Sequence, residues 1–270
     1  MEIKCLDHGY VRVVDLMGDD LSPLEAARMS TGNETGADPA KDDGLRDYLW
    51  RHKHATPFEM NALQLEVQCP IFVAREWMRH RVPFSYNEYS QRYSEALDLY
   101  YVPTTDRVQN GAQSNINKQS SDGLIPKETS ERITNHMQDE HIAQREMYES
   151  YLDYGLSREL ARLNIPVSNY TKFRVQANLR GWLQFVDLRI RPNAQHEIRV
   201  YAEAIADIIK HFYPKTYEVF EEYTLLGASF GHSEMNIIRD IMSELELDKP
   251  RIVEKLGKSK AREFFTKLGI

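Results

Sequence analysis

The stretch from Arg79 to Tyr93 concentrates side chains that could bind or transform a ligand. Its arginines, histidine, glutamate and serines are Arg79, Arg81, Arg92, His80, Glu88, Ser85 and Ser90. Guanidinium groups bind phosphate through paired hydrogen bonds. Since the whole chain has a formal net charge of -7, such a cluster indicates a phosphorylated small molecule as the ligand. The alternative is a solvated, charged helix end with ordinary surface ion pairs.

The elements that position this stretch can be read from hydrophobic spacing. Apolar and polar residues alternate from Asn61 to Cys69, which predicts a strand buried on one side. A helix is expected from Pro70 to near Pro83, with separate core and polar faces. Its core residues would be Ile71, Ala74 and Met78, and its outward residues Glu76, Arg79 and His80.

A second strand and helix are expected later in the chain. Tyr170 to Ala177 has the pattern of a strand, and Asn178 suits the N-cap of the next helix. That helix should end with Arg189 and Arg191, before Pro192, and bury Leu179, Leu183, Val186 and Ile190. Long helices are expected on either side, at 127–154 and 194–223, with a short helix capped by Ser157 between them.

The first residues predict a strand at 10–17 and a helix at 22–29. The sequence from Ser22 to Glu25 is typical of a capping box with proline at the first helical position. Residues 31–43 are rich in Gly, Asn and Asp and should form a loop, followed by a helix at 44–53 and a polar turn at Pro57.

Length and composition indicate a soluble globular protein. The hydrophobic content is 41% and the charged content 28%, and we find neither a signal sequence nor a membrane segment, so we expect a cytoplasmic protein. Cys5 and Cys69 should be reduced core residues. We expect one domain at 1–225, with a strand at 97–102 and a flexible insertion at 105–126, and a helical C-terminal extension at 226–270.

Four spaced blocks make the chain resemble the flavin-dependent thymidylate synthases over roughly residues 1–225. The blocks are Arg79-His80-Arg81 with Ser85-Tyr86-Asn87-Glu88-Tyr89-Ser90-Gln91-Arg92-Tyr93, then His54-Ala55-Thr56-Pro57-Phe58-Glu59, Asn178-Leu179-Arg180 and Asp187-Leu188-Arg189. The resemblance implies an α+β fold, in which an antiparallel sheet is combined with long helices, and a homotetramer with flavin sites shared between subunits. It implies reductive methylation of dUMP to dTMP with methylenetetrahydrofolate, NADPH and bound FAD.

The resemblance also assigns site residues, position by position. The implied flavin contacts are Ser30, His54, Thr56, Glu59, Arg79, His80, Arg81, Glu88, Asn178, Leu179, Arg180 and Gln184. The implied dUMP contacts are Glu76, Trp77, Met78, Arg79, Glu88, Tyr89, Ser90, Gln91, Arg92, Arg162 and Arg189. Arg189 matches the arginine that the family places against the pyrimidine, and it is the expected catalytic residue.

This chain departs from the family pattern at three places. Eight residues, Val82 to Tyr89, separate Arg-His-Arg from Ser90, where seven are usual. We place the extra residue at Pro83-Phe84, which leaves the block from Ser85 to Arg92 intact. Glu76 stands where many members have glutamine, and Gln184 where asparagine is common. A carboxylate at position 76 would need a donor or a sugar hydroxyl as its partner.

The residues support chemistry without a cysteine nucleophile. Neither cysteine is suitably placed to add to the pyrimidine, so a guanidinium aimed at developing negative charge must polarise the base. Arg189 is the candidate, although it could instead pair with Asp187 or cap its helix. His52 and His54 lack a third ligand at zinc spacing, so we expect no metal.

Two other functions fit the sequence less well. A nucleic-acid-binding module should be basic, whereas the isoelectric point of this sequence is about 5.8. A catalytically inactive nucleotide sensor would not need Arg189, which is present. We therefore expect no nucleic-acid partner.

Overall fold

The computed structural model divides the chain into two compact units, Met1–Leu225 and Leu226–Ile270. It describes residues 1–32, 34–115, 121–245 and 247–269. Within these ranges no helix combines the length and the apolar character needed to cross a membrane.

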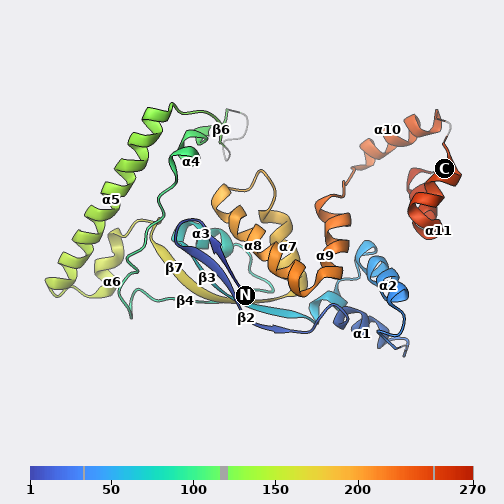
Figure 1. The fold of residues 1–270 in the computed structure, drawn as a ribbon, viewed down its shortest axis with the longest axis horizontal. Coiled ribbons are helices and arrows are strands. Elements are labelled where there is room, and N and C mark those ends of the chain that lie inside the picture. The colour runs from blue at the N-terminus through green and yellow to red at the C-terminus, as the bar shows by residue number, and fades with distance from the viewer. Residues whose placement is uncertain (33, 116–120, 246, 270) are drawn as a thin grey trace. The chain divides into compact units, whose positions relative to one another are not determined.

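The first unit is built on a five-stranded antiparallel sheet (Figure 1). Its strand order is β1-β2-β3-β7-β4, and the strands are β1 (Glu2–Cys5), β2 (Gly9–Met17), β3 (Ala62–Pro70), β7 (Tyr170–Asn178) and β4 (Ser85–Glu88). β3 and β7 pair along their whole length, from Ala62 opposite Asn178 to Pro70 opposite Tyr170. The expected α+β class with an antiparallel sheet is confirmed. β1 and β4 were not predicted, because four residues carry too little periodic signal.

One face of the sheet forms the core. The alternation predicted for β3 is confirmed, since Leu63, Leu65, Val67 and Cys69 are completely buried. On the opposite face the polar side chains pair with one another, and the amide of Gln64 donates to Gln176 at 3.2 Å. The sheet therefore has one apolar face to cover, as is common for antiparallel sheets.

Three helices cover the apolar face: α3 (Ile71–Trp77), α7 (Leu179–Arg189) and α8 (His196–Phe212) (Figure 1). In α7 the predicted stripe is buried at Leu179, Leu183 and Val186. The side chain of Asn178 accepts a hydrogen bond from the Gly181 amide at 2.9 Å, which confirms it as the N-cap.

The helix predicted to carry Arg79 and His80 ends before them, at Trp77. Its buried residues are Val73, Ala74 and Trp77 rather than the expected Ile71, Ala74 and Met78. The hydroxyl of Tyr86 on β4 donates to the carbonyl oxygens of Trp77 and His80, at 2.8 and 2.9 Å. This side-chain contact satisfies carbonyls at the helix end, and Arg79 and His80 lie in a turn and not on the helix.

The segment before β3 contains α1 (Ser22–Arg28), α2 (Pro39–Arg51) and the 3₁₀ helix η1 (Thr56–Glu59). The expected capping box at Ser22 is wrong, because its hydroxyl accepts from the Asp19 amide and α1 has no side-chain cap. α2 begins at Pro39 rather than at residue 44, since the carboxylate of Asp38 accepts from the Lys41 amide and provides the N-cap.

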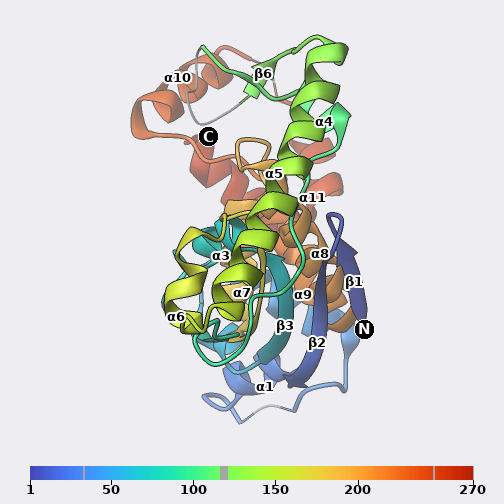
Figure 2. The same cartoon turned by 90° about the vertical axis from the view of Figure 1, so that its left-hand side faces the viewer.

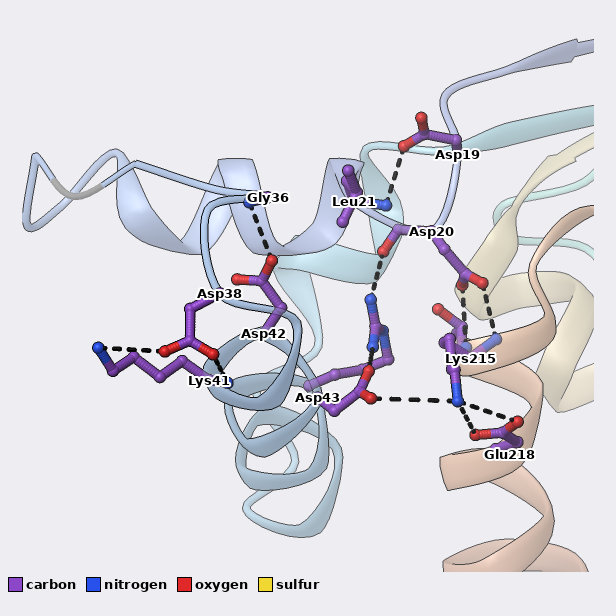
Figure 3. Close-up of polar contacts among 12 residues, drawn as sticks. Asp19, Asp20, Leu21, Gly36, Asp38, Lys41, Asp42, Asp43, Lys215 and Glu218 are labelled. Atoms are coloured by element: carbon purple, nitrogen blue, oxygen red, sulfur yellow. Dashed lines mark hydrogen bonds and ion pairs between the residues drawn. The ribbon is translucent and has the colours of Figure 1, made fainter.

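A polar network joins this segment to the end of the unit (Figure 3). The carboxylate of Asp20 accepts hydrogen bonds from the backbone amides of Lys215 and Thr216 at 2.7 and 2.9 Å. Arg46, 2% exposed, donates to the Asp20 carbonyl and to Asp43. Asp20, near the start of the chain, thus binds the first turn of α9 (Pro214–Phe220).

The single helix expected at 194–223 is interrupted at Pro214. α8 ends at Phe212, α9 begins at Pro214, and a π-helical turn, η3, follows at Glu221–Leu225. Proline cannot donate the backbone hydrogen bond that a continuous helix requires, and it is favoured at the first position of a new one.

The long helix α5 (Lys127–Asp153) agrees with its prediction, and it contacts α4 (Thr105–Gln109) and α6 (Arg158–Ala161) (Figure 2). The expected strand at 97–102 is reduced to one bridge, between Tyr100 and Asn169. The expected insertion at 105–126 contains α4 and the short strands β5 (Ala112–Gln113) and β6 (Ser121–Gly123), while 116–120 lie outside the described residues. The 3₁₀ turn η2 (Arg162–Asn164) follows α6.

The second unit consists of α10 (His232–Ser243) and α11 (Lys249–Leu268), so its predicted helical character is confirmed. Asp248 caps α11 by accepting from the Arg251 amide, and Pro250 lies at the start of the helix as expected. Gly257 adopts φ 75° and interrupts the helical backbone of α11.

Candidate active site

A cavity of about 590 Å³ lies where the turn after α3 faces α7, and we call it the arginine cavity. It is lined by Glu76, Arg79, His80, Arg81, Val82, Phe84, Gln184, Leu188 and Arg189. The structure therefore brings together six of the residues that the sequence assigned to a ligand site. Arg79 and Arg81 are exposed and form no ion pair within the described part of the chain.

Arg189 is held firmly within this cavity. Its guanidinium donates to the Glu76 carboxylate at 2.8 Å, to the Glu76 carbonyl at 3.1 Å and to Nε2 of His80 at 3.0 Å. The alternative pairing with Asp187 is wrong, because that carboxylate accepts from Arg191 at 2.5 Å. Arg189 thus points to the residues of the Arg-His-Arg turn.

The electrostatics of the cavity keep His80 neutral. Burial, together with the positive charge of Arg189, lowers the pKa of His80 to about 4. Nε2 accepts a hydrogen bond from Arg189, so the ring proton of the neutral imidazole must lie on Nδ1. Burial raises the pKa of Glu76, although Arg189 opposes this and Glu197 adds to it.

A second cavity, of about 530 Å³, lies between α1, α2 and η1, and we call it the α1–η1 cavity. Its lining includes Ser30, His54 and Thr56, all of them expected flavin contacts, together with apolar side chains such as Leu45 and Leu49. The structure brings Ser30 together with His54 and Thr56, although these two residues come more than 20 positions later in the chain. Such an apolar pocket with a few polar groups is typical of a cofactor subsite.

η1 and α7 are connected by an ion pair. The guanidinium of Arg180, in the first turn of α7, donates to the Glu59 carboxylate at 2.5 Å. Both are expected flavin contacts, whereas Leu179 is completely buried and could reach a ligand only through its backbone. The Trp77 side chain is likewise completely buried, and Met78 is half-buried.

The remaining expected dUMP contacts lie at the end of β4, in the segment that follows it, and in η2, and we call them the β4–η2 group. Glu88 accepts from the Thr171 hydroxyl at 2.7 Å, and the Gln91 amide donates to Asn169 at 3.1 Å. Arg92 pairs with Glu159 at 3.3 Å on the surface. The group also includes Tyr89, Ser90 and Arg162, and none of its members lines the arginine cavity of the same chain.

Both cysteines are unsuited to nucleophilic catalysis. Cys5 and Cys69 are free, buried thiols, as expected. Burial raises the pKa of Cys5 to about 12 and that of Cys69 well above its usual value. Thiols that remain protonated and shielded from ligands cannot attack a pyrimidine.

Some residues of the site were not found from sequence. Val82, Phe84 and Leu188 line the arginine cavity, and only their position beside the charged blocks could have indicated them. A further cavity of about 620 Å³ lies beside α4, α5 and α8 and contains none of the predicted residues. In its lining the buried Glu197 accepts from Arg107 at 2.8 Å.

The fold and the site define an α+β protein with converging guanidinium groups suited to an anionic ligand. Residues 12–215 match the family described as thymidylate synthase complementing protein. Flavin-dependent thymidylate synthases from Rickettsia bellii and Thermus thermophilus are 42% and 38% identical to the chain. The alignments cover 89% and 99% of this chain and 85% and 96% of those proteins.

The chain also resembles a solved methylase structure. The UMP/dUMP methylase PolB from Streptomyces cacaoi, bound with 5-Br dUMP, superimposes with a TM-score of 0.74 at 31% identity. The superposition covers 84% of this chain and all of the methylase chain. The chain therefore belongs to the flavin-dependent thymidylate synthase family, and it is an enzyme of the methyltransferase class.

Proposed function

We propose that the protein methylates dUMP to dTMP, using methylenetetrahydrofolate as the one-carbon donor and NADPH as the reductant through bound FAD. The observation that carries this proposal is the position of Arg189, which meets Glu76, Arg79, His80 and Arg81 in one cavity. Family membership and the likeness to a methylase bound with 5-Br dUMP support the choice of dUMP. The product would supply DNA synthesis in the cytoplasm.

The residues present fit a flavin dinucleotide. The α1–η1 cavity offers hydroxyl and imidazole groups within apolar walls, and the arginine cavity offers for phosphates the guanidinium groups of Arg79 and Arg81, which have no ion pair among the described residues. Ser30, His54 and Thr56 would hold FAD in the first cavity, and Arg79, His80, Arg81 and Gln184 would hold it in the second. When bound, FAD would supply the hydride chemistry.

The protein's own contribution is to polarise the pyrimidine. No thiolate is available, so the base must become reactive by another route. A guanidinium beside a uracil carbonyl favours negative charge on the ring and promotes loss of the N3 proton. Arg189 can do this because its position is fixed by two residues before any ligand arrives.

We also propose that the working enzyme is a homotetramer whose sites combine residues of different subunits. The β4–η2 group, which comprises Glu88 to Arg92 and Arg162, would bind dUMP, yet it does not line the arginine cavity of its own chain. Bringing a copy of this group to a neighbouring cavity would complete the site. Exposed apolar residues near Arg162, such as Leu160 and Leu163, at 49% and 72% exposure, fit a subunit contact.

The visible absorption spectrum of the purified protein, recorded with dUMP and then with NADPH under anaerobic conditions, tests the redox half. We expect a flavin spectrum that dUMP perturbs and NADPH bleaches. Formation of dTMP after adding methylenetetrahydrofolate tests methyl transfer, and UMP serves as the matched competitor. A colourless protein that FAD does not reconstitute would contradict the proposal.

A further inference from the structure

Arg189 differs from the other arginines of the arginine cavity because it is neutralised. Its guanidinium pairs with the Glu76 carboxylate at 2.8 Å, whereas Arg79 and Arg81 have no carboxylate partner in the described ranges. The side chains of Arg189 and Glu76 are only 21% and 25% exposed. Water therefore screens this pair less than a surface pair.

The carboxylate changes what Arg189 can bind. A free guanidinium is an effective phosphate ligand, and a cavity with three of them would bind any phosphate group in several ways. With Glu76 as its partner, Arg189 attracts a dianion less strongly than a free guanidinium does, because the nearby carboxylate offsets its charge. Three of its five N–H donors are used within the described part of the chain, and the other two can still bind one ligand oxygen. Such a group suits a single carbonyl oxygen on which charge develops better than a dianion.

We propose that Glu76 is a positioning residue that prevents Arg189 from binding phosphate groups and reserves its guanidinium for a carbonyl of the ligand. This inference rests on the proposed function, in which that carbonyl belongs to the uracil ring. Phosphates are directed to Arg79 and Arg81 instead. A glutamine at position 76 would keep the hydrogen bond to Arg189 but not the neutralising charge.

The charged groups around Glu76 determine how readily it is protonated, and Arg189 favours the ionised form that this role needs. Arg189 of α7 faces it directly, and Arg79 and Arg81 line the same cavity. Glu197 of α8 acts on it electrostatically, and both that repulsion and burial favour its protonated form. His80 receives a hydrogen bond from Arg189 and stays neutral above about pH 4, so it does not add charge at ordinary pH.

The test compares Glu76→Gln with wild type by measuring the affinity for sulfate, by calorimetry on the full-length proteins at the same flavin content. Sulfate is the probe because its charge is constant between about pH 5 and 8. Asp187→Asn is the matched control, since it removes a carboxylate on the same helix from Arg191, which lies just after the helix end. We expect Glu76→Gln to bind sulfate roughly tenfold more tightly and Asp187→Asn to remain within about twofold of wild type.

An unchanged sulfate affinity in a folded Glu76→Gln protein would overturn the proposal. If that variant does not fold, wild type and Arg189→Ala decide the question. The wild-type affinity for sulfate should increase on acidification, because protonation of Glu76 frees Arg189 to bind sulfate. Arg189→Ala lacks this guanidinium, so its affinity for sulfate should increase less on acidification. Equal pH dependence of the two proteins would refute the role of Glu76. Sulfate binding needs neither flavin nor folate, so its result is independent of the methylation assay.

Discussion

Replacing Arg189 with alanine separates a catalytic role from a structural one. The change removes three hydrogen bonds, at 2.8, 3.0 and 3.1 Å, and leaves the Glu76 carboxylate without its partner. Hydrogen bonds to charged groups contribute about 1.5–3 kcal/mol, but solvent reaches part of this pair. We therefore expect the free energy of unfolding to fall by about 1–3 kcal/mol, which urea denaturation would measure.

The expected loss of activity is larger than this loss of stability. Removing one preorganised donor from a site of developing charge typically lowers kcat by about 10²–10³. Arg189→Ala should therefore keep its flavin spectrum and its response to dUMP while single-turnover formation of dTMP slows by about that factor. The temperature of the assay must lie well below the unfolding transition of the variant.

Arg191→Ala is the matched control because it lies at the same helix end. Its guanidinium bonds to Asp187 at 2.5 Å and to the carbonyl oxygens of Thr224 and Leu225 at 2.7 and 2.8 Å. This variant should lose similar stability but retain kcat within a few-fold. If Arg189→Ala makes dTMP at a near wild-type rate, or if both variants lose activity equally, the catalytic role is refuted.

Three further predictions concern stability, measured by urea or thermal unfolding. Gly181→Ala should cost about 1–3 kcal/mol, because its Cβ would lie 2.6 Å from Cγ of the rigid Pro83 ring, whereas Gly44→Ala, with no atom within 4 Å, should be neutral or slightly stabilising. Asn178→Ala should cost about 1 kcal/mol through loss of the N-cap of α7, and an unchanged transition would show that the cap contributes nothing. Burial alone would raise the pKa of Glu197, but hydrogen bonds from Arg107 and Gln195 outweigh it and hold that pKa below 4.5. Glu197→Gln should therefore be less stable than wild type at pH 7, by about 1–3 kcal/mol, and the difference should shrink as the pH falls below 4.5; a constant difference would contradict this.

Sequence reasoning predicted the elements whose signals are local. The alternation of β3 and the N-cap at Asn178 depend on neighbouring residues only, and both are confirmed. The start of α2 could also have been found, since Asp38-Pro39 is a recognisable cap that was overlooked.

The remaining features depend on side-chain contacts between different elements of the fold. α3 ends at Trp77 because a tyrosine nine residues later binds its terminal carbonyl, which no propensity can indicate. Similarly, the partner of Arg189 is Glu76, 113 residues away, while the nearby Asp187 takes Arg191. The four sequence blocks indicated several residues that line the arginine cavity. Which of these residues form ion pairs with one another can be seen only in the folded chain.

The contact between Asp20 and the first turn of α9 bears on how the first unit is assembled during synthesis. The two amides that Asp20 binds lie 195 and 196 residues further along the chain. β3 must likewise wait for β7, with which it pairs along its whole length. The N-terminal half of the unit therefore leaves the ribosome with β3 paired to β2 on one edge only and with the Asp20 carboxylate lacking the amides that it binds. Folding of this half is therefore completed only after β7 and the start of α9 have been synthesised.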